Sequence, residues 1–204
     1  MLELHLLKHE TLHRDSKKDD ATAATFREMN DQIKELRRCQ EAMKVLHDNL
    51  QQYGRRDILE FWGIAQEANE DTTYIILDFL ESILGLRLSR HDISISHRQR
   101  QMHNKDREKF PDPIYVKVVN RWVKQDILYR KKKYMHRMKQ TNVFIVENLT
   151  QRRRELLATA REKLPNFKFI WVKEGNIFVR KFSKSRVHKI TSIDSISKLS
   201  EVAT

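Results

Sequence analysis

The chain has 204 residues, with 40 Lys or Arg against 28 Asp or Glu and a formal net charge of +12. A single cysteine, Cys39, excludes an internal disulfide and a multi-cysteine zinc module, and no apolar run of about eighteen residues exists that could cross a bilayer. Because the N-terminus lacks the uncharged apolar core of a signal peptide, we expect a soluble, intracellular protein, in either the nucleus or the cytoplasm.

Residues 1–25 are interpreted as a flexible or helical lead-in, with a loose polar joint over residues 15–25. His5, His9 and His13 recur at the spacing of one helical face, which can hold a metal ion. The alternative is a frayed helix with incidental histidines. Because the segment offers no further ligands, we expect neither a metal nor a cofactor.

Residues 26–54 show a heptad pattern and are predicted to form a coiled coil that ends before Gly54, read as a C-cap glycine. The alternative is a single amphipathic helix packed on the chain's own core. Self-association is favoured because the pattern is unbroken and the opposite face is strongly charged, while dimer and trimer both remain open. The expected seam consists of Met29, Ile33, Leu36, Gln40, Met43, His47 and Leu50.

Over residues 55–147 the hydrophobic periodicity predicts short strands interspersed with helices. Asp71 and Asn120 are predicted N-caps, and Gly85 follows the first of the two helices. The second helix is expected over residues 121–137, with Trp122, Val123, Ile127 and Leu128 facing inward. Strands are expected at residues 57–64, 91–97, 114–119 and 142–147. The order β-α-β-β-α-β predicts a ferredoxin-like domain, the scaffold of the RNA-recognition motif.

Residues 148–200 are predicted to form a small basic C-terminal domain. Thr150 can cap a helix that Pro165 stops, and Ser192 can cap a terminal helix. Between them, strands over residues 167–172 and 176–181 flank a glycine turn, and a third strand covers residues 186–190. The expected fold class is therefore α+β: an N-terminal coiled-coil helix, a ferredoxin-like domain and a small α+β domain.

The positive charge is concentrated in two segments. Residues 98–139 hold fourteen Lys or Arg and four acids, a net of +10, whereas residues 57–97 have a net charge of −6. Residues 141–204 have a net charge of +7. A concentrated positive field attracts polyanions, of which nucleic acid is the commonest. No GxxxxGK[ST], HExxH or GxSxG motif occurs, so we expect no enzyme and no catalytic residues.

Five stretches carry a family resemblance: ILEFWGIAQEANEDT, PDPIYVKVVNRWVKQDIL, NVFIVENLTQRRRELLATAREK, FKFIWVKEGNIFVRK and the basic loop before the second of these. Together they resemble the baculovirus few-polyhedra (FP) protein family and, more distantly, the first open-reading-frame protein of LINE-type retrotransposons. The retrotransposon likeness implies a coiled coil, an RNA-recognition-like domain and a basic C-terminal domain that bind and chaperone single-stranded nucleic acid. The baculovirus likeness implies a viral structural and egress-related factor.

The candidate nucleic-acid contacts come from both basic segments. Three arginines in the first turn of the helix after Thr150 oppose the helix dipole, which suggests an anionic partner there. Lys131 to Lys133 either contact phosphate or only complement a helix C-terminus, and the loop that begins at Arg98 either folds over a bound strand or is merely solvated. The candidates are Arg98, Arg100, Tyr115, Lys117, Lys131, Lys132, Lys133, Arg152, Arg153, Arg154, Arg180, Lys181, Lys184 and Arg186.

Aromatic residues suited to base stacking are few. The third strand of the predicted domain offers only Tyr115, next to Lys117, and the first strand can expose only one of Phe61 and Trp62 on each face. Trp171 could stack a base, although a core role is favoured. We therefore expect phosphate contacts to dominate.

The leading hypothesis is a self-associating, non-enzymatic protein that binds single-stranded nucleic acid between its two small domains. The alternative is a baculovirus-like structural or assembly factor whose basic face meets an acidic protein or a membrane surface. The choice between RNA and DNA, the base preference, and a viral, transposon-derived or domesticated origin stay open.

Overall fold

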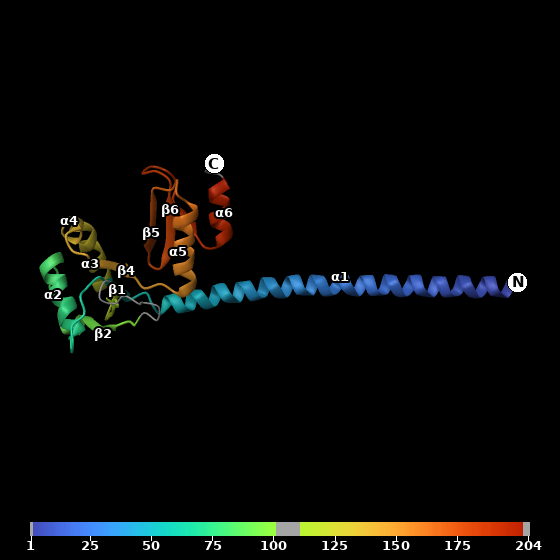
Figure 1. Ribbon diagram of the computed structural model, residues 1–204, viewed down its shortest axis with the longest axis horizontal. Coiled ribbons are helices and arrows are strands. Elements are labelled where there is room, and N and C mark those ends of the chain that lie inside the picture. Colours follow the sequence, from blue (N-terminus) through green and yellow to red (C-terminus); the bar gives the residue numbers. More distant parts are fainter. Residues whose placement is uncertain (1, 101–110, 202–204) are drawn as a thin grey trace. The chain divides into compact units, whose positions relative to one another are not determined.

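The computed structural model describes residues 2–100 and 111–201, with only the backbone described for residues 2–21 and 24. The chain divides into two compact units, Met1–Asn49 and Leu50–Thr204. Its elements are labelled in Figure 1. The predicted mixed α+β class, with an N-terminal helix and antiparallel sheets, is confirmed.

A single helix, α1 (Leu2–Tyr53), forms the N-terminal part of the chain. The loose joint predicted at residues 15–25 is therefore wrong, because the helix runs through it. This segment contains no Gly or Pro and includes Ala21, Ala23 and Ala24, all strong helix formers. The side chains of His5, His9 and His13 lie outside the described residues.

The apolar seam of α1 is exposed. Met29, Leu36 and Met43 have 52%, 69% and 66% of their surface accessible. The flanks carry short-range ion pairs such as Lys34 with Asp31, at 3.0 Å. The helix ends at Tyr53 as predicted, but Gly54 continues into a turn and does not take the left-handed conformation of a C-cap glycine.

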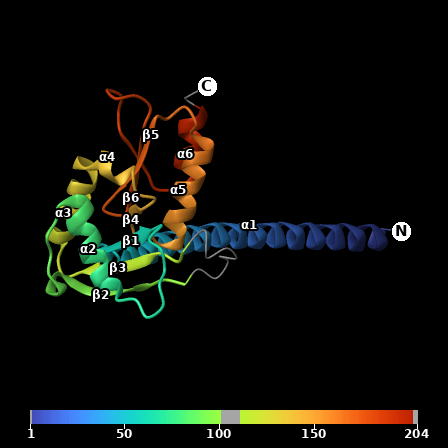
Figure 2. The ribbon, with the colours of Figure 1, turned by 60° about the vertical axis from the view of Figure 1, so that its left-hand side comes forward.

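A four-stranded antiparallel sheet follows, in the order β2-β3-β1-β4. Figure 2 shows this order, with α2 and α3 beside the sheet. A 3₁₀ turn, η1 (Arg90–Asp92), precedes β2, and a short helix, α4 (Met135–Met138), follows α3. The remaining elements are β1 (Ile58–Trp62), α2 (Thr72–Leu84), β2 (Ile93–Arg98), β3 (Ile114–Val118), α3 (Arg121–Lys133) and β4 (Phe144–Glu147).

Strand alternation builds the core of this part. Ile114, Val116 and Val118 of β3 are buried, while the intervening Tyr115 and Lys117 point to the opposite face. The buried side joins a cluster with the helices that includes Leu59, Phe61, Ile76, Leu80, Leu84 and Ile127. One sheet face is thus packed against α2 and α3, and the other carries the alternate side chains.

The caps predicted for α2 and α3 are confirmed, whereas the helix expected over residues 121–137 ends at Lys133, before the separate α4. Asp71 accepts hydrogen bonds from the N–H groups of Thr73 and Tyr74, Asn120 caps α3, and Gly85 ends α2 with φ of 60°. The inward position predicted for Trp122 is wrong, because this side chain is 79% exposed. The inward stripe of α3 passes instead through Val123, Ile127 and the buried stem of Lys124.

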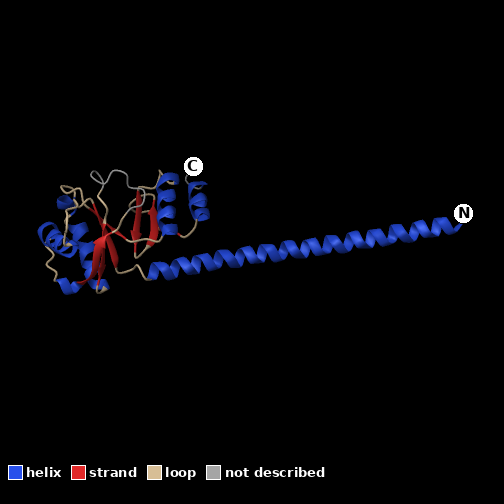
Figure 3. Ribbon diagram, turned by 60° about the horizontal axis from the view of Figure 1, so that its bottom comes forward, coloured by secondary structure: helices blue, strands red, loops and turns tan. Residues whose placement is uncertain are grey.

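The C-terminal part has a second sheet, separate from the first in Figure 3. Its strands β5 (Phe169–Lys173), β6 (Asn176–Arg180) and β7 (His188–Ile190) are antiparallel in that order. Helices α5 (Gln151–Lys163) and α6 (Ile193–Glu201) pack on one face through a cluster of Leu156, Ala160, Leu164, Ile177, Val179, Ile190 and Ile196. The predicted glycine turn is confirmed: Glu174 and Gly175 both have positive φ, as a two-residue hairpin of the I′ kind requires.

Among the described helices, none combines the length and the apolar character that a membrane span would need.

Candidate nucleic-acid interface

Arg98 lies at the end of β2, and its guanidinium is bound entirely by the protein. Nε and one Nη hold the Glu70 carboxylate at 2.6 and 2.9 Å, and the backbone carbonyls of Ile64, Ala65 and Asp112 take the remaining N–H groups at 2.6 to 2.8 Å. All five donors are used, and the side chain is 10% exposed. Arg98 is therefore no longer a candidate for phosphate binding, because none of its N–H donors remains for a phosphate.

The loop after Arg98 is described only as far as Arg100, which is exposed. The further basic residues of this loop, Lys105, Arg107 and Lys109, for which both a fold over a bound strand and a solvated loop were considered, lie outside the described residues. Arg100 remains a candidate.

A row of side chains crosses the face of the four-stranded sheet that is turned away from the helices. Register places His97, Tyr115, Glu60 and Val146 side by side, with Trp62 paired to Phe144 on the same face. Tyr115 stacks on His97 with ring centroids 4.9 Å apart. Burial raises the pKa of Tyr115, with Arg55 opposing the shift and Glu60 adding to it.

The centre of this row is a carboxylate. Glu60 is 4% exposed and accepts hydrogen bonds from the indole N–H of Trp62 and from the side-chain amide of Asn148. Lys117 and the 67% exposed Phe144 lie on the same face, on β3 and β4, the two strands that flank β1. The face thus has more rings than the sequence suggested, but its centre is a buried carboxylate and not a basic or aromatic side chain.

The three lysines at the end of α3 have different surroundings. Lys131 donates to the carbonyl of Ile145 at 2.7 Å, and burial lowers its pKa. Lys132 and Lys133 are exposed, and no carboxylate of the described residues lies within ion-pair distance of either. Lys132 and Lys133 are therefore the members of this run that remain available to an anion.

The arginines that begin α5 are partly used by the protein. Arg153 donates to the carbonyl of Gly175 at 2.8 Å, and Arg154 lies 4.0 Å from Glu60. Thr150 caps the helix by accepting from the N–H of Arg153. Arg152 is half-buried. The unfavourable placement of Arg153 and Arg154 at a helix start thus has a structural explanation.

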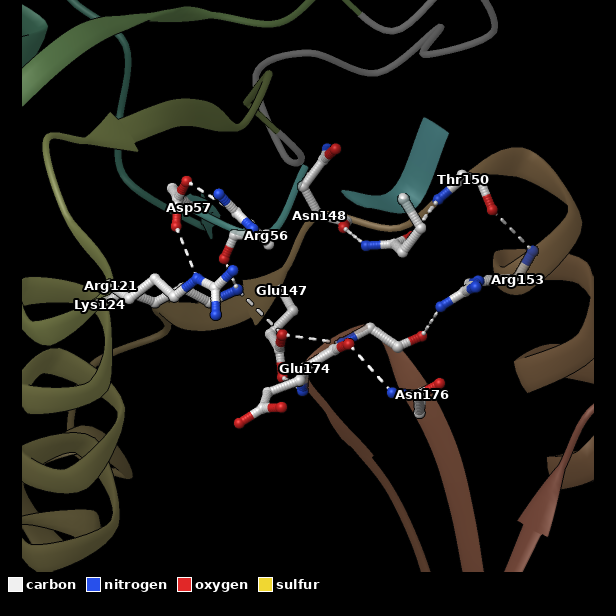
Figure 4. A network of polar contacts seen from close by, with 12 residues as sticks. Arg56, Asp57, Arg121, Lys124, Glu147, Asn148, Thr150, Arg153, Glu174 and Asn176 are labelled. Carbon is white, nitrogen blue, oxygen red and sulfur yellow. Dashed lines mark hydrogen bonds and ion pairs between the residues drawn. The ribbon is translucent and has the colours of Figure 1, made fainter. Parts of the chain in front are cut away.

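A buried polar network joins the two sheets at this point (Figure 4). Glu147 accepts from Lys124 Nζ at 2.9 Å and from the backbone N–H groups of Glu174 and Gly175 at 3.0 and 3.1 Å. Lys124 also donates to the carbonyl of Arg56 at 2.7 Å. The side chains of Lys124 and Glu147 are each 7% exposed. Glu147 therefore ties the end of β4 to α3 and to the β5–β6 turn.

Gln52 completes the junction from the last turn of α1, which belongs to the second compact unit. Its amide donates to the carbonyl of Asn148 at 2.9 Å and accepts from the N–H of Thr150 at 3.0 Å. A Cβ on Gly175 would lie 2.7 Å from the Gln52 side chain, so the turn fits only glycine here. Sequence reasoning missed Gln52, Lys124 and Glu147, because no local pattern distinguishes them from surface residues.

The cations of the β5–β6 hairpin and the loop after it are the least engaged of the candidates. Lys184 and Arg186 are exposed, Lys181 lies over the ring of Phe182 at 5.9 Å, and Arg180 lies over Phe169 at 4.8 Å. Within the described residues, no carboxylate pairs with any of the four. The part of the chain that the structure describes also contains no group of three or more His, Cys, Asp or Glu that could hold a metal ion.

Residues 150–200 match the family described as Baculovirus FP protein domain 2. The match covers α5, the three-stranded sheet and nearly all of α6, and it supports the relation to baculovirus FP proteins that the sequence suggested. The comparison with curated proteins gave no match.

The Glu147 junction predicts a large and selective loss of stability. In Glu147→Gln, the new amide N–H group confronts Lys124 and the hairpin N–H groups, so one partner of a buried ion pair is lost. We expect the free energy of unfolding to fall by about 3 kcal/mol, measured by urea denaturation. Glu174→Gln is the matched control, because only its backbone takes part, and should change stability little. Equal stability of the two variants would contradict this account.

Glu70 predicts a pH dependence. Its hydrogen bonds to Arg98 hold its pKa below the usual 4.5, so its stabilising effect is fully present above about pH 4.5 and is lost as the pH falls through the lower, folded pKa. Glu70→Gln should therefore be less stable than the wild type at neutral pH, and the gap should close on acidification. Urea denaturation between about pH 3 and 7 measures the gap, and a gap independent of pH would rule out this linkage.

Proposed function

We propose that this chain is a non-enzymatic, self-associating protein that binds single-stranded nucleic acid chiefly through its phosphates. The observation that carries the proposal is the set of exposed cations left after protein partners are accounted for. Lys132 and Lys133 on α3, and Lys184 and Arg186 after β6, have no carboxylate partner among the described residues. They stand on two folded parts that the Glu147 network holds together.

Within this proposal, the four-stranded part is a ferredoxin-like domain of the RNA-recognition kind. The strand order β2-β3-β1-β4 supports it, with α2 in the first crossover and α3, followed by the short α4, in the second. So does the helix-free face with Tyr115, Trp62 and Phe144, since aromatic rings on that face receive bases in such domains. Glu60 at its centre is a departure, and it moves the expected phosphate contacts to the rim.

Self-association is proposed through α1. Its seam leaves Met29, Ile33, Leu36, Met43 and Leu50 between 41% and 69% exposed in the single chain. A parallel coiled coil of two or three copies would bury these side chains, with Gln40 and His47 as polar layers that set the register. Several weak sites linked in one particle would raise the affinity for a long polymer.

Salt-titrated binding tests the nucleic-acid proposal. Fluorescence anisotropy of a labelled single-stranded RNA should give an affinity that falls steeply with salt. The double variants Lys132→Ala with Lys133→Ala, and Lys184→Ala with Arg186→Ala, should each weaken binding and make the negative slope of log K against log salt shallower by about 1.4. These positions are better targets than Arg153, whose loss would also disturb the hairpin.

The matched control is Lys163→Ala with Lys198→Ala, two exposed cations on α5 and α6, which should bind as the wild type does. Salt-independent binding, or no binding of RNA, would reject the proposal. The latter result would favour the alternative, in which the basic surface meets an acidic protein or a membrane surface.

The coiled coil is tested by mass in solution. Light scattering should give the wild type a multiple of the 24.6 kDa chain mass, and Leu36→Glu should reduce it to one chain, because like charges would meet in one layer of the seam. Val45→Glu places the same charge outside the heptad seam and should keep the oligomer. A wild-type monomer, or an unchanged mass for Leu36→Glu, would overturn the assignment of the seam.

A further inference from the structure

The three-stranded sheet has a second face, opposite the helices α5 and α6. Inward positions of β5 and β6 hold Ile170, Val172, Ile177 and Val179, which join the core. The alternate, outward positions include Phe169, Trp171, Phe178 and Arg180, all half-buried. Register pairs Phe169 with Arg180 and Trp171 with Phe178 across the two strands.

These four side chains form one continuous stack. The rings of Trp171 and Phe178 lie nearly parallel, 23° apart, with centroids separated by 5.8 Å. The Arg180 guanidinium lies 4.8 Å from the centroid of Phe169 and 6.0 Å from that of Trp171. The sequence favoured a core role for Trp171, but this ring sits outside the core cluster of its domain.

The hydrogen-bond donors of the stack have no acceptor within the described chain. Arg180 Nε is buried and has no hydrogen-bond partner, and neither the rest of its guanidinium nor the indole N–H of Trp171 donates a hydrogen bond within the described chain. Shielded donors normally find acceptors. A guanidinium held in place by rings, whose Nη groups donate to no acceptor of the described chain, is suited to a phosphate or a base carbonyl.

The charge of this face has one sign. Lys189 of β7 pairs with Phe178 and extends the row, and Lys173 and Asn176 occupy the remaining outward positions of β5 and β6. No Asp or Glu occupies an outward position of these three strands. The four-stranded sheet differs, because Glu60 stands at the centre of its free face.

We propose that the outward face of the three-stranded sheet is a stacking site for unpaired bases of single-stranded nucleic acid. A base stacks on the Trp171 and Phe178 rings, while Arg180 and Lys189 hold the adjoining phosphates. This inference rests on the proposed function and adds to it, since it assigns base contacts to the C-terminal part of the chain. It predicts a preference for single strands over duplex, because a duplex keeps its base faces covered.

The test compares two labelled strands of equal length on the full chain: oligothymidylate and an abasic strand with the same phosphates. The wild type should bind oligothymidylate more tightly. Trp171→Leu should weaken oligothymidylate binding at least about fivefold and leave abasic binding unchanged. Trp122→Leu, at the exposed tryptophan of α3, should behave as the wild type does. The Arg180 guanidinium donates to no acceptor of the described chain, so Arg180→Gln should keep the fold. This variant should weaken the binding of both strands.

The outcomes separate this inference from the function on which it rests. If neither strand binds, the proposed function fails. If the wild type binds both strands equally, or prefers oligothymidylate with Trp171→Leu unchanged, the stacking site is overturned while phosphate binding stands. A polyglutamate peptide bound by the wild type and lost in Trp171→Leu, with no preference for bases, would assign the face to an acidic protein and would also overturn the inference.

Discussion

The arrangement of residues 50–204 depends on one buried carboxylate. Glu147 and its counter-ion Lys124 are both almost removed from water, and an ionised group in that position is tolerated only when paired and fully hydrogen-bonded. The remaining partners of Glu147 are backbone N–H groups of the β5–β6 turn. The charge can be satisfied only when α3, β4 and the hairpin meet at one point, so the pair specifies how the two sheets join.

That junction has consequences for the basic residues around it. Arg153 is drawn to the hairpin carbonyl of Gly175, and Arg154 is drawn toward Glu60. Further away, Arg98 spends every donor on Glu70 and on backbone carbonyls. A high net charge is therefore not itself a binding surface, because part of the excess is consumed in holding the fold. Only the cations with no internal partner can attract a polyanion without first breaking an ion pair or a hydrogen bond of the fold.

Much of the local structure was predictable. Each predicted strand was found within a few residues of its place, because alternation of apolar and polar residues is a direct consequence of strand geometry. The caps Asp71, Asn120 and Thr150 were also identified, since a short polar side chain before a helix serves the free N–H groups of its first turn. The break predicted before Phe26 failed because polar composition does not by itself interrupt a helix that lacks Gly and Pro.

The candidate site was less predictable. The sequence grouped Arg98 with the basic loop, and nothing near it in the chain indicates that Glu70, twenty-eight residues earlier, accepts its charge. Likewise, Trp122 was assigned to the core from its position in a helix, whereas the stem of Lys124 occupies the inward stripe. Which residues neutralise one another depends on contacts between distant segments.

By itself, then, the amino-acid order determined the α+β class, the antiparallel strands, the helix ends and the uneven distribution of charge. These follow from side-chain periodicity and from hydrogen bonds between near neighbours. Only the tertiary structure decided which cations are spent on carboxylates, that Glu147 joins the two sheets, and that Trp171, Phe178 and Arg180 share an outward face. Those properties arise where strands and loops distant in the chain come together, because burial there gives each charge and each ring its partners.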